Sequence, residues 1–294
     1  KESRHLNQLI DYSHYKKTKN KIQKLFKNES NPLSIVKNSE NRGEIIIKEG
    51  EQINYKIVVS DFNKNKISVT IPIIGKNDKI NHFKHKIESQ FYVYENNELI
   101  LSNDNKEVYI PKNAVYEDSP ILFKTIGDTI FVGDKKTPLH KNITISFNNN
   151  NKYNSEDRSK LYVSNLGYNN TPIYISTYKK DNKIIGKTKS FGKFTLTSDI
   201  NNPTIKPVNT KQGKWMTNAK TLQMKIIDKE SGIKKYRATI NNKWALMEYD
   251  AKKNLLSYNF NDNIHNSGEN KFKLIVIDNV GNNSIFEMTF FRKN

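Results

Sequence analysis

The sequence of 294 residues contains no cysteine, which excludes disulfides, thiolate zinc sites and cysteine nucleophiles. Glycine is scarce, with 12 residues, and none forms a glycine-rich phosphate loop or the G-x-S-x-G turn that presents a nucleophilic serine. No apolar run approaches the roughly 18 residues that a membrane-spanning helix needs. We therefore expect a chain that is not an integral membrane protein, with any export signal preceding Lys1.

Arginine is also rare, although the formal net charge is +19. Only five of the 49 basic residues are arginine. Proteins that read nucleic-acid bases rely heavily on the bidentate guanidinium group, and here lysine and asparagine are spread along the whole chain instead. We therefore expect no nucleic-acid partner. We interpret the net charge as the result of a lysine-rich surface. The functional alternative is that this surface attracts anionic polymers of a cell envelope.

Aromatic residues, by contrast, are plentiful, with 15 Tyr and 14 Phe. Flat rings pack well on a pleated, half-buried surface, so this composition favours strands. The chain is longer than a typical domain of roughly 100–200 residues, which favours two or three domains. The sequence predicts a mainly β protein of tandem immunoglobulin-like β-sandwich domains with a short N-terminal helical segment.

Residues 1–77 form the first predicted domain. Apolar residues at helical spacing predict a helix over residues 3–26, which ends before Pro32. Only three strands follow, at residues 44–48, 55–60 and 67–74. A sandwich needs about seven strands, so we expect residues 1–77 to be the C-terminal half of an immunoglobulin-like domain with a helical insert. Its first half would precede Lys1.

Two further domains are predicted, a central β-sandwich at residues 78–200 and a C-terminal immunoglobulin-like domain at residues 201–294. Short apolar runs are separated by turn-forming Asn, Asp and Gly residues throughout. Central strands are predicted at residues 91–94, 99–102, 107–110, 121–125, 129–132, 143–147, 160–164, 172–178 and 193–197. C-terminal strands are predicted at residues 222–227, 235–240, 243–249, 255–260, 271–278 and 284–291, with Asn241-Asn242 as a tight hairpin turn.

One pattern occurs twice in the chain. A strand ends on Asp61 or on Asp278, an asparagine follows four residues later, and a second alternating strand resumes. The pattern predicts a hairpin whose Asp carboxylate accepts backbone N–H groups across the turn, with Asn or Gly in the left-handed position. The first and last domains are therefore expected to share one fold.

The histidines do not form a catalytic pattern. Neither an H-E-x-x-H helix nor an H-x-H pair is present. The nearest approach is His82 and His85 with Glu88, which is interpreted as a polar connector. The sequence thus assigns no catalytic, cofactor-binding or metal-ligating residue. The sequence does not decide whether two carboxylates from distant residues come together as a catalytic pair, as they do in glycoside hydrolases.

Two other groups have alternative interpretations. Asp228, Asp278, Asn279 and Asn282 carry oxygens that could bind calcium, but turn formation explains them more simply. Trp215, Trp244 and Tyr249 could form an aromatic ligand platform. A sandwich core requires large residues, and core packing is the favoured interpretation.

Several segments together resemble a known family, the lysostaphin/LytM-type zinc metallopeptidases of Bacteroidetes, in the region that follows their catalytic domain. The resemblance is strongest in residues 203–293. The segments that carry it are Pro203-Thr204-Ile205-Lys206-Pro207, Gly213-Lys214-Trp215, Ile227-Asp228, Ser231-Gly232-Ile233-Lys234-Lys235-Tyr236-Arg237-Ala238-Thr239, Trp244, Leu246-Met247-Glu248-Tyr249-Asp250 and Asp278-Asn279-Val280-Gly281-Asn282. Weaker similarity lies in Ser3-Arg4-His5-Leu6-Asn7, Ile10-Asp11-Tyr12 and Asn31-Pro32-Leu33-Ser34.

The resemblance implies a secreted or periplasmic peptidoglycan endopeptidase whose zinc is held by H-x₃-D and H-x-H motifs. Neither motif is in this sequence, so zinc is expected only in an upstream catalytic domain, and this chain would be a non-catalytic accessory region. Its expected partner is peptidoglycan, another envelope component or an envelope protein complex. The expected location is the periplasm, cell envelope or exterior. The alternative is a structural or binding subunit of an outer-membrane or cell-surface complex without an enzyme.

Overall fold

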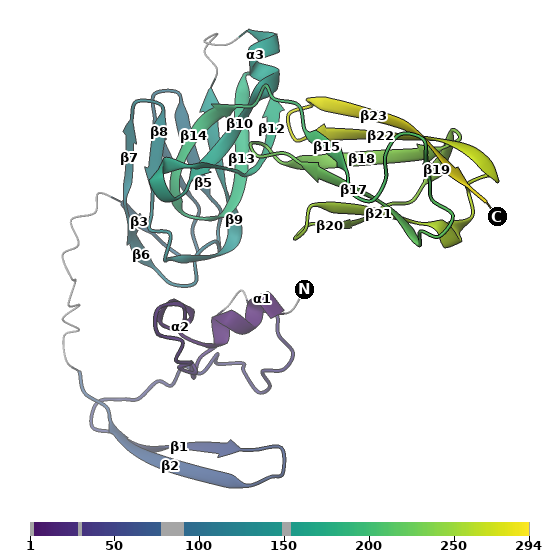
Figure 1. The fold of residues 1–294 in the computed structure, drawn as a ribbon. Helices are drawn as coiled ribbons and strands as arrows, with labels where there is room; N and C mark the ends of the chain where they lie inside the picture. Colours follow the sequence, from purple (N-terminus) through teal and green to yellow (C-terminus); the bar gives the residue numbers. More distant parts are fainter. Residues whose placement is uncertain (1–2, 29–30, 78–90, 149–153, 294) are drawn as a thin grey trace. The chain divides into compact units, whose positions relative to one another are not determined.

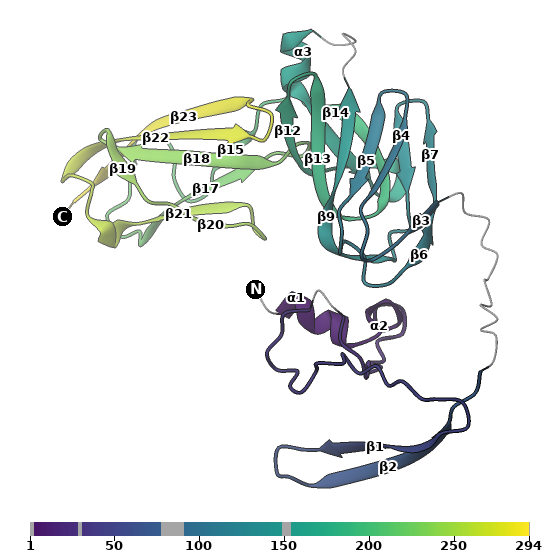
Figure 2. The same cartoon turned by 180° about the vertical axis from the view of Figure 1, so that it is seen from behind.

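The computed structural model describes residues 3–28, 31–77, 91–148 and 154–293, and β-strands dominate these parts (Figures 1 and 2). The chain divides into two compact units, Lys1–Gln90 and Phe91–Asn294. His82, His85 and Glu88 lie outside the described residues.

The first unit begins with short helices rather than one long helix. They are α1 (Ser3–Leu6), η1 (Asn7–Leu9) and α2 (Tyr12–Thr18). The helix predicted over residues 3–26 is therefore wrong in its extent. Asp11 starts a new helix by accepting the N–H of His14 at 2.9 Å, and Lys19 ends that helix in a left-handed conformation with φ of 67°. The following residues turn back and form an isolated bridge between Ile10 and Gln23.

A long hairpin completes the first unit. Strands β1 (Gln52–Ser60) and β2 (Lys66–Ile74) pair antiparallel over their full lengths. The strand predicted at residues 44–48 is absent, and this segment runs without strand pairing into the hairpin. Large apolar side chains remain exposed along both hairpin strands, including Val59, Ile67 and Val69. The hairpin thus has no core of its own.

The second unit begins with a β-sandwich that has a five-stranded sheet on each side. One sheet has the order β11-β10-β14-β8-β7 and the other β12-β13-β9-β5-β4, and β3 and β6 form an additional pair. The strands are β3 (Phe91–Val93), β4 (Leu99–Asn103), β5 (Lys106–Ile110), β6 (Ser119–Ile121), β7 (Phe123–Ile126), β8 (Thr129–Val132), β9 (Pro138–Asn148), β10 (Leu161–Leu166), β11 (Pro172–Tyr174), β12 (Ser176–Lys180), β13 (Lys183–Ser190) and β14 (Gly192–Ser198). Helix α3 (Ser155–Lys160) precedes β10, and η2 (Tyr168–Asn170) follows it.

A second sandwich follows in the same unit. A four-stranded sheet of order β15-β17-β21-β20 faces a five-stranded sheet of order β16-β23-β22-β18-β19. The strands are β15 (Thr204–Pro207), β16 (Lys214–Trp215), β17 (Thr221–Ile227), β18 (Ile233–Ile240), β19 (Lys243–Ala245), β20 (Glu248–Asp250), β21 (Leu255–Asn259), β22 (Gly268–Asp278) and β23 (Asn283–Arg292), with η3 (Phe260–Asp262) after β21. The predicted turn at Asn241-Asn242 is confirmed, since both residues have positive φ as a two-residue hairpin turn requires.

Each sandwich has its own hydrophobic core. The central core includes Val108, Ile145 and Phe194, and the C-terminal core includes Leu274 and Phe290. Apolar residues alternate in β22 as predicted, with one set buried between the sheets and the other facing outward. The predicted fold class, mainly β with tandem immunoglobulin-like β-sandwiches and a short N-terminal helical segment, is confirmed. The assignment of residues 1–77 to half of such a domain stays a prediction.

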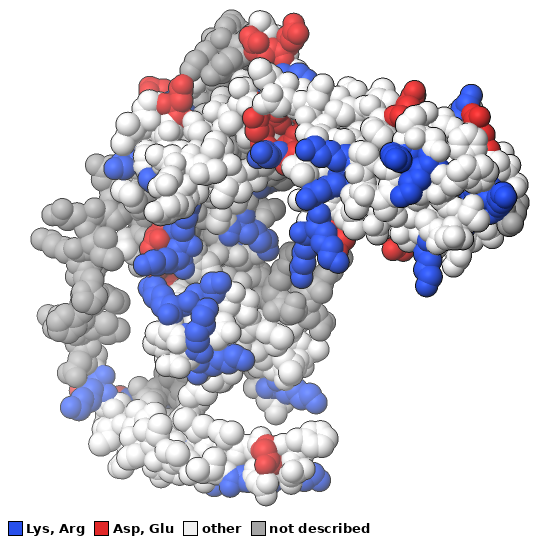
Figure 3. Space-filling model, in the orientation of Figure 1, with Lys and Arg blue, Asp and Glu red and all other residues white. Residues whose placement is uncertain are grey.

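Basic side chains are scattered over the visible face in Figure 3, with acidic side chains among them. Among the described residues, no helix combines the length and the apolar character that crossing a membrane requires.

Candidate functional site

The histidines of the described chain do not assemble a catalytic centre. His140 is buried against Tyr116 in the central sandwich, and His265 packs edge-on against Phe260 in the C-terminal sandwich. Within the described ranges, the one group of three or more His, Asp or Glu side chains close enough to share a metal ion is Asp199, Asp228 and Asp278. We call these three residues the acidic cluster.

The tryptophans lie at the surface, so the prediction that they belong to the core is wrong. Trp215 is 55% exposed and Trp244 is 58% exposed, whereas Tyr249 is half-buried and lies against Tyr236. The reason is topological, because Trp215 is on β16 and Trp244 on β19, the two edge strands of one sheet. Edge strands leave part of a large side chain uncovered.

Both tryptophans belong to the outer face of the five-stranded sheet, which we call the tryptophan face. Trp215 pairs with Phe291 in register, and their rings are 5.2 Å apart, on the side opposite the buried Phe290. Trp244 pairs with Thr239, which in turn pairs with Lys273. With a strand spacing of about 4.8 Å, the two edges of the sheet lie roughly 19 Å apart.

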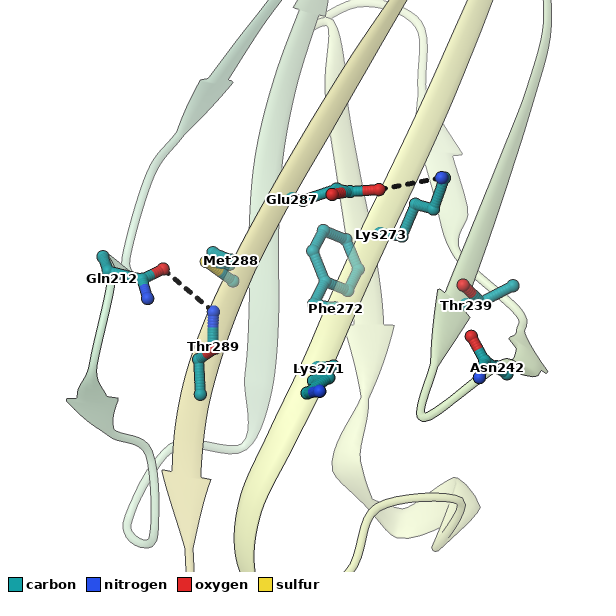
Figure 4. A pocket seen from close by; sticks show the side chains of 9 residues that line it. All are labelled: Gln212, Thr239, Asn242, Lys271, Phe272, Lys273, Glu287, Met288 and Thr289. Atoms are coloured by element: carbon teal, nitrogen blue, oxygen red, sulfur yellow. Dashed lines mark hydrogen bonds and ion pairs between the residues drawn. The ribbon is translucent and has the colours of Figure 1, made fainter.

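A shallow depression of about 370 Å³ lies on this sheet between the edge strands (Figure 4). Its rim is polar. Lys273 forms an ion pair with Glu287 at 2.8 Å, and the Thr289 N–H donates to the side-chain oxygen of Gln212 at 2.9 Å. The complete lining is Gln212, Thr239, Asn242, Lys271, Phe272, Lys273, Glu287, Met288 and Thr289. The face thus combines polar and cationic groups with an exposed indole on each side.

The two repeated Asp turns have the same hydrogen bonds. Asn65 donates its backbone N–H and its side-chain amide to the Asp61 carboxylate, and Asn282 does the same to Asp278. The predicted Asp-centred hairpins are therefore confirmed. Gly281 takes the left-handed position in the second turn, but Lys64 takes it in the first, where Asn or Gly was expected. Asp61 is exposed, whereas Asp278 is completely buried.

A third Asp loop lies beside Asp278. Asp228 follows β17 and accepts the N–H groups of Glu230 and Gly232 at 3.0 and 2.7 Å through one carboxylate oxygen, Oδ1. Asp199 follows β14, the last strand of the central sandwich, and accepts the Ser231 N–H at 3.0 Å. The side-chain amide of Asn282 donates to the Asp199 carbonyl at 2.9 Å, so the acidic cluster lies where the two sandwiches meet.

The carboxylates of this region alter one another's ionisation. Burial raises the pKa of Asp228, and the charges of Asp199 and Asp278 raise it further. The pKa of Glu230 is raised because its carboxyl shares a hydrogen bond with Asp199. Burial alone would raise the pKa of Asp199. The interactions of its carboxylate with Ser231 and Glu230 have the larger effect, and the pKa is lowered. Tyr162 lies nearby, and burial together with these carboxylates raises its pKa to about 12.

Asp228 and Asp278 make the turns that the sequence predicted, but their proximity to Asp199 was missed. Asp199 is far from both in sequence and belongs to no repeated motif. The signal that could have drawn attention to it is its place at the boundary between two predicted domains.

Comparison with known proteins gives limited matches. Residues 90–199 match the Zu5-like domain family. No curated protein matches the chain. An endo-beta-1,4-mannanase from Thermotoga petrophila has 15% identity over 33% of this chain and 21% of its own, with a TM-score of 0.27. The fibronectin(III)-like modules of Clostridium thermocellum CbhA have 14% identity over 52% of this chain and 86% of their own, with a TM-score of 0.25. This chain therefore spans about a fifth of the mannanase.

Proposed function

We propose that this chain is a non-catalytic accessory region of a peptidoglycan metallopeptidase of the cell envelope, and that its tryptophan face binds the glycan of the wall. The observation that carries the proposal is the position of Trp215 and Trp244, exposed on the two edge strands of one five-stranded sheet. The zinc ligands of such an enzyme would lie in another domain. The proposed location is the periplasm or the cell envelope.

The chemistry of the face suits a wall polymer. Exposed indole rings provide flat apolar surfaces with an N–H donor, and sugar rings offer a matching pattern of C–H groups and hydroxyls. The depression between the indoles presents the hydroxyls and amides of Thr239 and Asn242. Lys271, also on this face, can attract the carboxylates of the peptide stems in peptidoglycan.

The test is co-sedimentation of the 1–294 chain with purified insoluble peptidoglycan. We expect retention at physiological salt and its loss in the double variant Trp215→Ala/Trp244→Ala. Tyr168→Ala is the matched control, because Tyr168 is an aromatic residue exposed on the central sandwich. These are the two tryptophans of the chain, so their fluorescence also reports contact with soluble glycan fragments directly.

Equal retention of the double variant and the wild type would contradict a role of the tryptophan face. Failure of the wild type to sediment would contradict wall binding altogether.

A second function, a binding subunit of an envelope protein complex, is favoured by the β1–β2 hairpin. An isolated two-stranded hairpin is marginally stable in water, and this one exposes apolar residues and has no strand of the described residues paired to either edge. A strand of a partner protein could pair with such an edge. This function predicts no change in tryptophan fluorescence when peptidoglycan fragments are added.

A further inference from the structure

We propose that Asp199, Asp228 and Asp278 bind one divalent cation of the calcium type at the junction of the two sandwiches. This site is separate from the tryptophan face and does not depend on the function proposed above. It rests on the spacing of the carboxylates, on a buried hydroxyl beside them and on the charge of the region.

The spacing of the three carboxylates suits a single ion. One oxygen from each residue lies within 4.8 Å of the other two. Calcium binds oxygens at about 2.3–2.6 Å, so two ligands of one ion are at most about 5 Å apart. Asp199 and Asp278 are fully buried, and Asp228 is partly buried. A cation bound by these oxygens would therefore be largely shielded from water.

The hydrogen bonds hold the carboxylates in place and still leave oxygen lone pairs available. Backbone N–H groups orient Asp228 and Asp278 through Oδ1 of each residue. No hydrogen bond from a described residue reaches Asp228 Oδ2. Asp228 is thus fixed by one oxygen and has its second oxygen open, which arranges it in advance for a cation, whereas Oδ2 of Asp278 also accepts the Asn282 amide at 2.7 Å.

Ser231 provides an independent observation. Its side chain is only 1% exposed, and among the described residues its hydroxyl has no hydrogen-bond partner, although its backbone N–H donates to Asp199 Oδ2. The hydroxyl is close enough to the Asp199 carboxylate to lower its pKa, but no described group meets the geometry of a hydrogen bond with it. Leaving a buried hydroxyl unpaired is costly, and a neutral oxygen beside the Asp199 carboxylate is a ligand that calcium accepts.

The negative charge around the acidic cluster also favours a bound cation. Glu230 adds a fourth carboxyl group in contact with Asp199. The basic group closest to the acidic cluster in the hydrogen-bond network is Lys160, whose ammonium donates to Asn282 Oδ1 at 2.5 Å and not to a carboxylate. Among the described residues, no basic group forms an ion pair with these carboxylates, and buried negative charge without a counter-charge is strongly unfavourable, so a divalent ion would neutralise it. All candidate ligands are oxygens, which favours calcium or magnesium over zinc or copper.

The ligands come from both sandwiches. Asp199 follows β14 of the central sandwich, while Asp228 and Asp278 follow β17 and β22 of the C-terminal sandwich. A bound cation would therefore add a link between the sandwiches, beside the hydrogen bonds that Lys160, Ser231 and Asn282 already form across the junction.

The experiment uses the 1–294 chain after treatment with a calcium chelator. Calorimetric titration with CaCl₂ up to about 10 mM covers the range of weak structural calcium sites, and thermal unfolding is followed in parallel. We expect one bound ion per chain and a higher unfolding temperature. A second titration with MgCl₂ tests the choice of metal, and we expect weaker binding because magnesium demands a stricter octahedral geometry.

The main variant is Asp228→Asn, which keeps the Oδ1 acceptor of the turn and removes the charge. We expect it to lose calcium affinity by about tenfold or more. Asp250→Asn is the matched control, because Asp250 also accepts two loop N–H groups but stands outside the acidic cluster. The double variant Trp215→Ala/Trp244→Ala should bind calcium like the wild type.

Two outcomes would overturn the proposal. One is a wild-type chain that shows neither binding heat nor a thermal shift with calcium or magnesium. The other is a folded Asp228→Asn variant that binds calcium as tightly as the wild type and the Asp250→Asn control. Terbium, which emits when excited through a nearby tyrosine such as Tyr162, provides a second readout in the same variants.

Discussion

At the level of single residues, Arg292 near the end of the C-terminal sandwich makes four interactions. Arg292 donates to the carbonyls of Met216 and Ala219, donates through Nε to His265 Nε2 at 3.1 Å, and lies over the Phe260 ring at 4.1 Å. Since His265 Nε2 accepts this hydrogen bond, the imidazole is neutral in the folded protein. Burial lowers the pKa of His265, and the adjacent Arg292 charge lowers it further.

This arrangement predicts a loss of stability in acid. The unfolded chain takes up a proton at His265 near pH 6.5, whereas the folded chain resists protonation until a lower pH. The stabilisation is therefore fully present above about pH 6.5 and is lost as the pH falls through the folded-state pKa. Urea unfolding at about pH 7.5 and pH 5 should show a smaller loss for His265→Gln, whose side-chain oxygen can still accept from Arg292. Equal losses in wild type and variant would contradict this account.

At the level of secondary-structure elements, the two Asp hairpins differ in the residue at their left-handed turn position, which is Lys64 in the first and Gly281 in the second. Lys64 has a φ of 68°, a conformation that costs a residue with a side chain about 1–2 kcal/mol, whereas Gly281 occupies the equivalent place without that cost. Nothing lies within 4 Å of a Cβ atom built on Gly281, so substitution there introduces backbone strain and no collision.

We therefore expect opposite effects from two substitutions. Lys64→Gly should slow amide hydrogen exchange in β1 and β2, because it relieves strain in their turn. Gly281→Ala should lower the unfolding free energy by about 1–2 kcal/mol in chelator-treated protein. An unchanged exchange rate in Lys64→Gly would show that the turn does not limit the opening of the hairpin.

Strands whose apolar residues alternate strictly could be predicted from the sequence, and others could not. β22 was found because Phe272, Leu274 and Val276 mark one buried face. β13 was missed because Ile184, Ile185 and Gly186 are buried in succession, which removes the alternation. Gly186 is buried for a steric reason, since a Cβ atom there would lie 2.6 Å from the Ile175 side chain.

The candidate sites depend on contacts between distant residues, which periodicity does not reveal. The Asp turns were predictable because the carboxylates of Asp61 and Asp278 accept hydrogen bonds from residues at most four positions away. Their meeting with Asp199 depends on how one sandwich follows the other. In the same way, the exposure of Trp215 and Trp244 depends on their edge positions, and edge order is set by topology rather than by local sequence.

Over the molecule as Figure 3 shows it, charged side chains of the described residues are dispersed rather than concentrated. Figure 3 shows lysine and arginine side chains distributed over the visible face, in agreement with a net charge of +19 supplied mainly by lysine. Such a surface attracts polyanions weakly and without a defined footprint. Specific recognition by this chain is therefore better sought at the tryptophan face, which has a defined geometry.

The two separate cores of residues 91–294 predict two unfolding events. Ile145 and Leu274 are both completely buried, one in each core. Substitution of either by alanine should cost about 2–5 kcal/mol and lower the transition of its own sandwich by several degrees. Calorimetry of Ile145→Ala, Leu274→Ala and the double variant can separate these transitions.

Independent sandwiches would give one shifted transition in each single variant and two in the double variant. If both single variants instead lower one common transition, residues 91–294 unfold as a single cooperative unit, and the predicted domain boundary near residue 200 would be contradicted. The acidic cluster adds a condition to this experiment, since its ligands follow strands of both sandwiches. Calcium should raise both transitions in the wild type, because unfolding of either sandwich would release the ion.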